Sequence, residues 1–564
     1  MAEETERMQA AIRFCGQLRF CEELVALGGR VAAHPAPAER LPLARRELQK
    51  ALFSNSRGGF YPFGNASDGL FPVVSLPFKD AYVFNTNERA PLLLVLEGYQ
   101  LPRKDASPGI DCSRNTDLAE GFSAVHAHIF GAGNSTDFLW EDLENGMPDS
   151  MEGASPDAIM TPAQVKEFMS SNPNAHATQS IKETVHILRS KNEGIDRPPD
   201  VPSIDEGSAN SEAILYAKRM RESNLISEKE YKELVAKDKL FQKNLRDHAH
   251  LDVQFWLALS FGETWAAKAR RLRRESPHGG RAGWGLRSLL VKTNADLRQE
   301  VFTLQLIGLC KQIFEEAGLN LWLSAYQILP TSSTTGFVET LINSISLDAL
   351  KKHESFISLE QHFVETYAKH TKTIQPLDEA RSEYIASLAA YSLVCYLFQI
   401  KDRHNGNILL DTAGHLVHID FGFLLGSAPG GAFSIETAPF KLTEEMVAVL
   451  GGPRSRLFAD FVCRFTCGFL ALQRAHDRVL ATVELLAEGA SAGGGGSGGA
   501  AAFNFLGPGK TQRDMLERLS QRFRRDLTWV ETIQFCLDLI KKSYRNANTK
   551  RYDDFQWISQ GIKP

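Results

Sequence analysis

The sequence lacks any pair of cysteines at the spacing of a metal knuckle or a redox centre. Its eight cysteines are scattered, and Cys463 and Cys467 lie one helical turn apart in an apolar stretch with no further ligand residues nearby. This pattern argues against a zinc site or a disulfide framework. Buried free thiols in a reducing compartment are the better interpretation.

The sequence also lacks an excess of positive charge and has few long apolar runs. The formal net charge of −5 gives no sign of bulk nucleic-acid binding, so attraction to an anionic membrane would need a local patch. The run Tyr384–Ile400 contains Ser, Tyr and Gln, and we predict a buried helix rather than a membrane span. The acidic N-terminus shows no signal-peptide pattern. We therefore expect a cytoplasmic protein with at most peripheral membrane contact.

Composition shifts along the chain predict five regions. Residues 1–53 are expected to be helices at the end of a helical region, and residues 54–101 carry short apolar runs typical of strands. Residues 102–250 are rich in Ser, Asn, Asp, Gly and Pro, which predicts a largely disordered insertion. Strands resume in residues 251–338. Residues 339–564 are mainly helical in pattern, with a flexible glycine-rich loop at 489–502.

Three local features give further expectations. Pro35, Pro37 and Pro42 are predicted to break the first helix, and a second helix is expected from about Leu43 to Phe53. The segment Ser75–Asp80 is interpreted as a hairpin turn, although its place between strands would also suit a loop that covers phosphates. Residues 263–274 predict a helix with five cations, either a solvated face or a surface for membrane or phosphate.

Most of the chemistry is concentrated in residues 401–422. Asp402, His404 and Asn407 lie on one predicted loop, and Asp420 lies on a second. Two apolar runs flank a Thr-Ala-Gly turn between these loops and predict a hairpin, which would bring Asn407 close to Asp420. An amide oxygen facing a carboxylate suits Mg²⁺, which prefers hard oxygen ligands.

A second motif lies upstream. A predicted strand ends at Lys292, and Glu300 follows eight residues later at the start of a helix. This arrangement would place an ammonium group on ATP phosphates, with Glu300 holding it. A surface ion pair is the alternative. The linker at residues 339–341 could pair its backbone with adenine.

Together, these motifs resemble the phosphatidylinositol 3-/4-kinase superfamily. The residues that carry the resemblance are Asp402-Arg-His-Asn-Gly-Asn407, His418-Ile-Asp-Phe-Gly422 and Asp296-Leu-Arg-Gln-Glu300. The order Asp-Arg-His, rather than His-Arg-Asp, is unlike ordinary protein kinases. Longer stretches, 395–411 and 421–442, resemble the type III phosphatidylinositol 4-kinases of beta type. The resemblance implies an α+β, two-lobed, protein-kinase-like fold, with an antiparallel sheet in a mixed N-lobe and a mainly helical C-lobe.

The resemblance also implies roles for individual residues, with ATP and Mg²⁺ as cofactors and Mn²⁺ as a substitute. Asp402, His404 and Lys292 would be catalytic, and Asn407 and Asp420 would bind the metal. Arg403 would support its loop. Structural roles are favoured for His415 and His418. The implied nucleotide-binding residues are Lys292, Glu300, Tyr326, Glu339, Thr340, Leu341, Leu409 and Ile419.

The phosphate acceptor is indicated by an absence of positive charge in one segment. Residues 423–440 contain no Lys or Arg, whereas enzymes acting on phosphorylated inositides need cations there. Plain phosphatidylinositol in a membrane therefore suits this segment. The resemblance implies transfer to the 4-hydroxyl, on Golgi or related endomembranes, with protein recruiters that the sequence does not identify. A phosphatidylinositol 3-kinase, a phosphoinositide-kinase-related protein Ser/Thr kinase and a non-enzymatic scaffold are the alternatives.

The aromatic C-terminal tail leaves two interpretations open. Tyr552, Phe555, Trp557 and Ile558 could lie at a membrane interface or could cap the core of the C-lobe.

Overall fold

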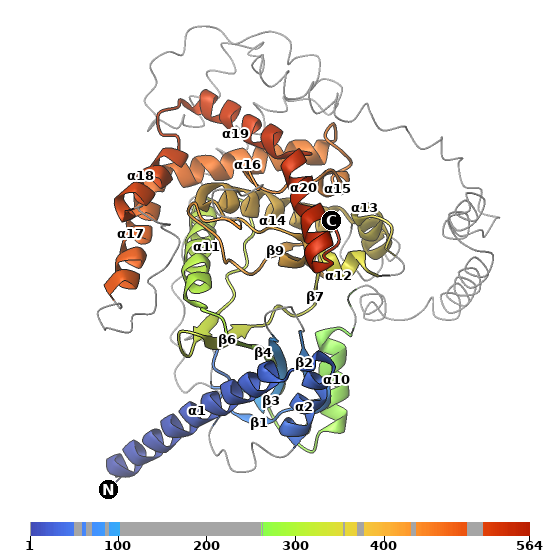
Figure 1. Cartoon of the computed structure of the whole chain (residues 1–564), viewed down its shortest axis with the longest axis vertical. Helices are drawn as coiled ribbons and strands as arrows, with labels where there is room; N and C mark the ends of the chain where they lie inside the picture. The colour runs from blue at the N-terminus through green and yellow to red at the C-terminus, as the bar shows by residue number, and fades with distance from the viewer. Residues whose placement is uncertain are drawn as a thin grey trace, which may run out of the picture.

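The structure is a computed structural model that describes residues 2–49, 59–63, 70–84, 90–101, 261, 263–353, 356–368, 377–429, 436–492 and 511–564. The insertion predicted at 102–250 lies outside these residues, as does most of the glycine-rich loop predicted at 489–502. The described chain forms an N-lobe around an antiparallel sheet and a C-lobe built mainly of helices (Figure 1). The predicted α+β, two-lobed fold is confirmed.

The N-lobe sheet has the strand order β1-β3-β4-β6-β5, and β2 also pairs with β3. Its strands are β1 (Val73–Ser75), β2 (Tyr82–Val83), β3 (Leu92–Tyr99), β4 (Trp284–Thr293), β5 (Ile328–Pro330) and β6 (Thr335–Glu339). The partners of β3 and β4 run from Leu92↔Val291 to Tyr99↔Trp284. Two segments on either side of residues 102–260 therefore lie side by side.

The hairpin turn predicted at Ser75–Asp80 is wrong. β1 and β2 do not pair with each other, because Val73 is the partner of Gly98 and Tyr82 is the partner of Leu93. The two short strands thus follow one another along the same strand, β3. The 3₁₀ helix η1 (Phe78–Asp80) connects them.

Helices cover both faces of this sheet because its strands alternate buried apolar side chains. α1 (Ala2–Ala33) and α2 (Pro37–Gln49) pack on the face that includes Leu92, Leu94 and Leu96. On the other face, Leu272 of α10 (Trp265–Glu275) packs against Val95 and Leu286.

The predicted break is confirmed at Pro35, which lies between α1 and α2, but it is wrong at Pro37 and Pro42, since α2 contains both residues. Pro37 is the first residue of the helix, where the missing N–H would have no partner within the helix. Pro42 lies inside α2 and removes one backbone hydrogen bond.

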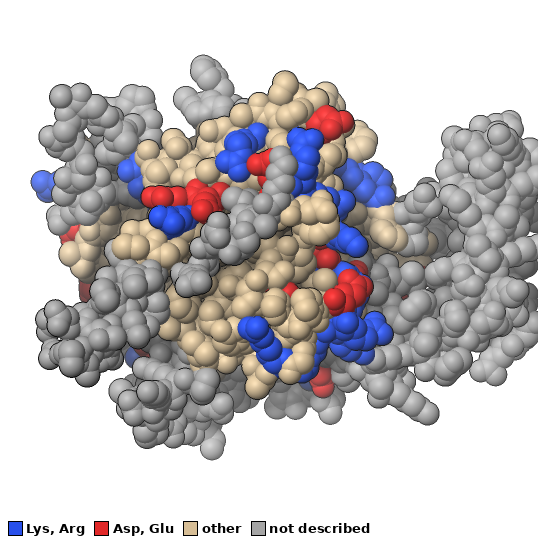
Figure 2. All heavy atoms as spheres, turned by 90° about the horizontal axis from the view of Figure 1, so that it is seen from below, with Lys and Arg blue, Asp and Glu red and all other residues tan. Residues whose placement is uncertain are grey.

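The cations of α10 are partly neutralised. Arg271 forms ion pairs with Asp80 and Glu263, and Lys268 lies 3.8 Å from Asp80, whereas Arg270 and Arg274 are exposed. Seen from below, the molecule shows Lys and Arg side chains beside Asp and Glu rather than one continuous basic surface (Figure 2). A solvated face accounts for this pattern.

The C-lobe is arranged around α14 (Leu377–Phe398), in which all residues from Tyr384 to Phe398 are buried. The buried helix predicted for this run is confirmed. Among the described residues, no helix combines the length and apolarity needed to cross a membrane. The other helices are α11 (Arg298–Glu316), α12 (Leu347–Lys351), α13 (Leu359–Phe363), the π-helix η4 (Val364–Ala368), α15 (Glu444–Ala448), α16 (Arg456–Arg474), α17 (His476–Ala492), α18 (Gln512–Arg522), α19 (Trp529–Ser543) and α20 (Ala547–Gln560).

A second, smaller sheet is formed within the C-lobe part of the chain and carries the candidate site. Its strands are β7 (Ser344–Ser346), β8 (Ile408–Asp411) and β9 (Leu416–His418), all antiparallel. β8 and β9 form the predicted hairpin, with Ile408 opposite His418.

Candidate active site

Both acid-bearing loops meet at the open end of the β8–β9 hairpin. The N–H of Ile419 donates to the carbonyl of Asn407 at 3.0 Å, which extends the strand pairing by one step. Asn407 therefore lies beside the residue that precedes Asp420, and their predicted proximity is confirmed for the backbone. Nδ2 of Asn407 donates to the carbonyl of Asp402 at 3.0 Å. This bond leaves the amide oxygen of Asn407 facing away from Asp402.

Asp402 and Asp420 both have left-handed backbones, with φ of +67° and +57°. Side chains with a Cβ rarely adopt this conformation, so surrounding contacts must hold it. The buried guanidinium of Arg403 supplies such contacts. It donates to the carbonyls of Ile419, at 2.8 Å, and of Asp420. Arg403 thus ties the two loops together, as a loop-supporting residue would.

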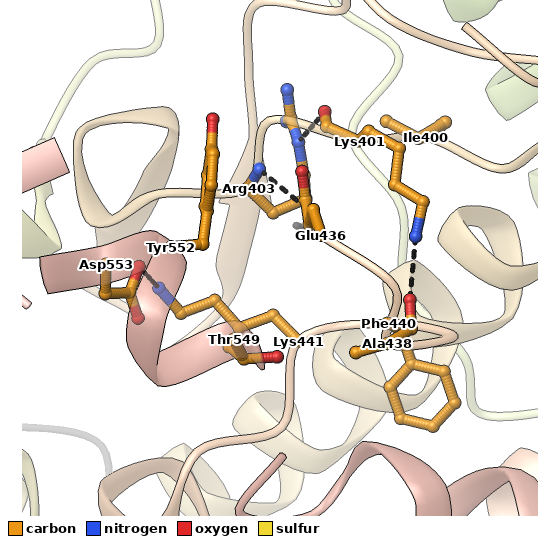
Figure 3. Close-up of a pocket in the computed structure, with 10 residues that line it drawn as sticks. All are labelled: Ile400, Lys401, Arg403, Glu436, Ala438, Phe440, Lys441, Thr549, Tyr552 and Asp553. Atoms are coloured by element: carbon orange, nitrogen blue, oxygen red, sulfur yellow. Dashed lines mark hydrogen bonds and ion pairs between the residues drawn. The ribbon is translucent and has the colours of Figure 1, made fainter. Parts of the chain in front are cut away.

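Glu436 also holds this loop. Its carboxylate accepts from the backbone N–H of Asp402 at 2.6 Å. It also accepts from the backbone N–H of Arg403 at 3.4 Å (Figure 3). Burial raises the pKa of Glu436, an effect opposed by these bonds. Sequence patterns did not reveal this contact, because no periodicity relates residues so far apart.

His404 has a defined tautomer when neutral. Its Nδ1 accepts from the N–H of Gly406 at 3.1 Å, so the ring proton lies on Nε2, which is 3.8 Å from Oδ1 of Asp402. Burial lowers the pKa of His404 despite the nearby carboxylate. A neutral ring with its N–H toward Asp402 is thus the favoured form.

Lys292 and Glu300 form a buried ion pair. Nζ of Lys292, on β4, lies 2.7 Å from Oε1 of Glu300, in the first turn of α11. Their side chains are only 12% and 6% exposed, so the alternative of a surface pair is wrong. The neighbouring Gln299 donates to the carbonyl of Gly422 at 2.6 Å. α11 therefore joins the lysine to the Asp-Phe-Gly segment.

The linker between the lobes offers fewer backbone groups than predicted. The N–H of Glu339 donates to the carbonyl of Gln327 at 2.8 Å, and its carboxylate accepts from the N–H of Gln327. The backbone N–H of Glu339 is therefore not available to a nucleotide. Oγ1 of the next residue, Thr340, is buried without a hydrogen-bond partner in the described part of the chain. Thr340 and Leu341 are the better candidates for contact with a base.

The remaining predicted nucleotide-binding residues border the same region. Tyr326 is buried, and burial raises its pKa well above the usual range, with smaller contributions from the charges of Glu300 and Asp420. Leu409, on β8, and Ile419 are partly buried against the main core.

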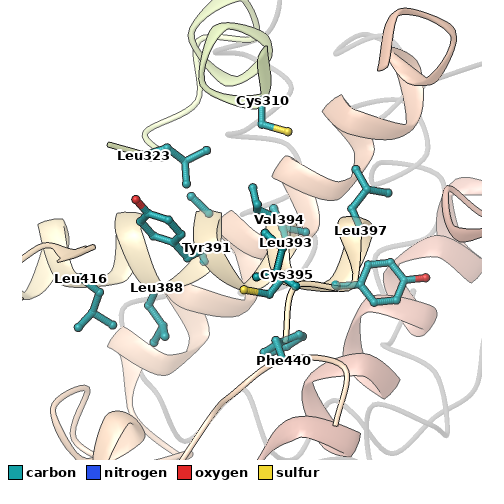
Figure 4. Packing of buried hydrophobic residues seen from close by; sticks show 14 of the residues in the cluster. Cys310, Leu323, Leu388, Tyr391, Leu393, Val394, Cys395, Leu397, Leu416 and Phe440 are labelled. Atoms are coloured by element: carbon teal, nitrogen blue, oxygen red, sulfur yellow. The ribbon is translucent and has the colours of Figure 1, made fainter. Parts of the chain in front are cut away.

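His415 and His418 have protein partners, in keeping with structural roles. His415 stacks on Trp322 and bonds to Asp411 and Glu383 at 2.9 and 3.0 Å. His418 stacks on Tyr391, which lies with Cys395 in the core around α14 (Figure 4). Burial lowers the pKa of His418 well below its usual range.

The C-terminal helix α20 divides the aromatic tail between two environments. Tyr552 is buried and its hydroxyl donates to Oδ1 of Asp402, a contact that the sequence did not predict. Phe555, Trp557 and Ile558 face outward and are 55%, 45% and 83% exposed. The tail thus contributes both to the core and to the surface.

Comparison with known proteins finds a family profile that is similar to the part of the chain carrying most of this site. Residues 287–491 match the sequence profile named Phosphatidylinositol 3- and 4-kinase. The chain is 39% identical over 307 residues to Phosphatidylinositol 4-kinase beta 1 of Arabidopsis thaliana, which covers 53% of this chain and 26% of that protein. It is 35% identical over 306 residues to Phosphatidylinositol 4-kinase beta of Rattus norvegicus, which covers 54% of this chain and 35% of that protein.

The chain thus spans only about a quarter to a third of these curated relatives. The matched residues include Lys292, Glu300, the loop with Asp402 and Asn407, and the Asp-Phe-Gly segment. Residues 287–491 form a phosphatidylinositol 3- and 4-kinase domain.

Proposed function

We propose that this chain is a lipid kinase that transfers the γ-phosphoryl group of ATP to the 4-hydroxyl of phosphatidylinositol. The observation that carries the proposal is the convergence of Asp402, Asn407 and Asp420 at the end of one hairpin, in a domain that also buries the Lys292–Glu300 pair. The similarity to phosphatidylinositol 4-kinases of beta type supports the 4-hydroxyl.

In this proposal, Lys292 contacts the ATP phosphates. The buried carboxylate of Glu300 pairs with the ammonium group of Lys292 and fixes its direction. Thr340 and Leu341 face the adenine, while Tyr326, Leu409 and Ile419 line the nucleotide pocket.

The donor set of the site fits Mg²⁺, and Mn²⁺ as a substitute. Asn407 and Asp420 offer an amide oxygen and a carboxylate, and Mg²⁺ prefers such hard oxygen ligands while taking few from the protein. The hydrogen bond from Nδ2 of Asn407 to Asp402 orients the amide so that its oxygen can serve as a ligand. When bound, the ion neutralises charge on the phosphates.

The chemical step is an in-line displacement at the γ-phosphorus. The inositol oxygen forms a bond to phosphorus, the bond to the bridging oxygen of ADP breaks, and the proton of the hydroxyl passes to the carboxylate of Asp402. His404 directs its Nε2–H into the same space and would donate to the transferred phosphoryl group. Preorganised charges around the transferred group supply most of the catalysis.

The segment after the Asp-Phe-Gly motif favours an acceptor without extra phosphates. Residues 423–440 carry no Lys or Arg that could neutralise a phosphorylated headgroup. The nearest following cation, Lys441, is buried and bonds to Asp553 at 2.7 Å. It is therefore not available to a headgroup.

Because the acceptor stays in a bilayer, the protein must dock on the membrane surface. The outward face of α20, with Phe555, Trp557 and Ile558, suits the interface between headgroups and acyl chains. Peripheral association with Golgi or related endomembranes belongs to this proposal, together with unidentified protein recruiters.

The test is to incubate the protein with ATP, Mg²⁺ and phosphatidylinositol vesicles and to identify the position of the new phosphate. We expect phosphatidylinositol 4-phosphate. A 3-phosphate would favour a phosphatidylinositol 3-kinase, and phosphorylated protein without lipid product would favour a protein kinase. Asp420→Ala serves as the inactive control, and full activity in that variant would contradict the metal assignment.

A further inference from the structure

The contact between Tyr552 and Asp402 joins the C-terminal helix to the proposed proton acceptor. The two residues are 150 positions apart in the chain, and the Tyr552 hydroxyl donates to Oδ1 of Asp402. Nε2 of Gln556 in turn donates to the Tyr552 oxygen at 2.8 Å. Because the oxygen already accepts from Gln556, its own proton is directed toward Asp402.

The direction of this hydrogen bond, from Tyr552 to Asp402, agrees with the weak acidity of the Tyr552 hydroxyl. Burial, followed by the charge of Asp402, raises the pKa of Tyr552. The hydroxyl therefore keeps its proton and acts as a donor to the carboxylate.

Asp402 is held by hydrogen bonds to both its backbone and its carboxylate. Oδ1 accepts from Tyr552, the backbone N–H is bonded to Glu436 at 2.6 Å, and the carbonyl accepts from Asn407. Among the described residues, the second oxygen, Oδ2, has only the longer contact of 3.4 Å with Nδ2 of Asn407. Oδ2 is thus the oxygen better able to receive a proton from an acceptor hydroxyl.

A buried ion pair fixes the helix that carries Tyr552. Nζ of Lys441 lies 2.7 Å from Oδ1 of Asp553, the residue after Tyr552, and their side chains are only 4% and 7% exposed. The same ammonium donates to Oδ1 of Asn405 in the catalytic loop at 3.0 Å. Nδ2 of Asn405 donates to the carbonyl of Lys563, beyond the end of α20, at 2.9 Å. The middle of the helix and the segment just after its C-terminal end are therefore both bonded to the loop.

We infer that Tyr552 is a positioning residue for phosphoryl transfer, which orients the Asp402 carboxylate so that Oδ2 faces the acceptor hydroxyl. Packing alone would require only an aromatic ring, which Phe supplies equally well. The hydroxyl is what reaches Asp402. This inference rests on the proposed lipid-kinase function and adds to it a residue outside the family match at 287–491.

The experiment compares Tyr552→Phe with Tyr396→Phe in the full chain, with ATP, Mg²⁺ and phosphatidylinositol vesicles. Tyr396 is the matched control, since its hydroxyl donates to the carbonyl of Arg522 at 3.0 Å and does not bond to the catalytic loop. For Tyr552→Phe we expect kcat to fall about 10- to 100-fold, the usual effect of losing a group that orients a reacting residue. KM for ATP and for lipid should change by less than about twofold, because neither substrate touches Tyr552. Tyr396→Phe should keep the wild-type kcat.

A double-mutant cycle with Asp402→Ala tests whether Tyr552 acts through Asp402. Residues that act as a unit are non-additive, so Tyr552→Phe should cause no further loss of kcat when Asp402 is absent. Thermal unfolding of the same four proteins gives a readout without activity. Tyr552→Phe should lower Tm in the wild-type background and have a smaller effect in the Asp402→Ala background.

An unchanged kcat in Tyr552→Phe, a rise in KM without a fall in kcat, or additive effects in either cycle would overturn the inference and leave the proposed function intact. Failure of the wild-type protein to make any lipid product would overturn the proposed function instead.

Discussion

Nζ of Lys292 lies 2.7 Å from Oε1 of Glu300, and this ion pair is buried between β4 and the first turn of α11. Lys292→Met would leave the Glu300 carboxylate buried without its cation. We expect a loss of about 3 kcal/mol in the free energy of unfolding, measured with urea, and a large loss of kinase activity. The double variant Lys292→Met with Glu300→Gln should regain stability but not activity. Recovery of both would mean that Lys292 does not act on the phosphates.

The metal assignment predicts a changed dependence on Mg²⁺. Asn407→Ala removes one of the two proposed oxygen ligands, so the Mg²⁺ concentration for half-maximal rate should rise about 10-fold or more. The measurement is a titration of initial rate against Mg²⁺. Asp526→Asn is the control, because Asp526 lies on the surface and pairs with Arg524. An identical Mg²⁺ curve for Asn407→Ala would remove Asn407 from the site.

The outward face of α20 predicts an effect on membrane binding alone. Ile558 is 83% exposed, so Ile558→Glu should leave Tm unchanged while it weakens sedimentation with phosphatidylinositol vesicles. Leu485→Glu is the matched control, because Leu485 is 69% exposed on the distant helix α17. Equal loss of vesicle binding in both variants would point to general charge repulsion rather than to a docking face on α20.

The burial of His362 leads us to predict that the protein loses stability in mild acid. Burial lowers its pKa from the ordinary value of 6.5 to about 4, so the unfolded chain binds its proton first as the pH falls. The free energy of unfolding should therefore decrease between pH 6.5 and 4, by about 3 kcal/mol from this group. Urea unfolding at several pH values should show a shallower decrease for His362→Leu. The same pH dependence in wild type and variant would contradict this assignment.

His415 provides a control of opposite sign. Burial opposes its protonation, but the hydrogen bonds to Asp411 and Glu383 outweigh burial and raise its pKa. Its stabilising contribution is complete below the unfolded pKa and is lost as the pH rises. His415→Gln should therefore make the decrease in stability toward acid steeper.

Contacts within one turn or one hairpin could be predicted from the sequence. The pairing of Lys292 with Glu300 follows from a strand, a turn and a helix, and the approach of Asn407 to Asp420 follows from two short apolar runs. In both cases the geometry of local elements sets the distance. The start of α19 could also have been placed, since Thr528 and Glu531 form a capping box.

Contacts between distant segments could not be predicted in this way. Glu436 reaches Asp402 across 34 positions and Tyr552 reaches it across 150, and no periodicity relates such pairs. The sequence did contain one indication that Tyr552 is buried, namely the helical spacing of the tail residues. In a helix, Tyr552 and Gln556 share one face while Phe555 and Ile558 share another, so the tail could have been divided into a buried and an exposed side.

The pairing of β3 with β4 sets an order for folding during synthesis. β3 emerges from the ribosome long before its partner, because residues 100–283 separate the two strands. Until residues 284–293 are made, the apolar edge of β3 stands open to strands of other chains. Each doubling of such a connection costs the finished fold only about 0.6 kcal/mol. The length of this segment is thus of little consequence for stability, but it prolongs the interval in which the nascent N-lobe is exposed to aggregation.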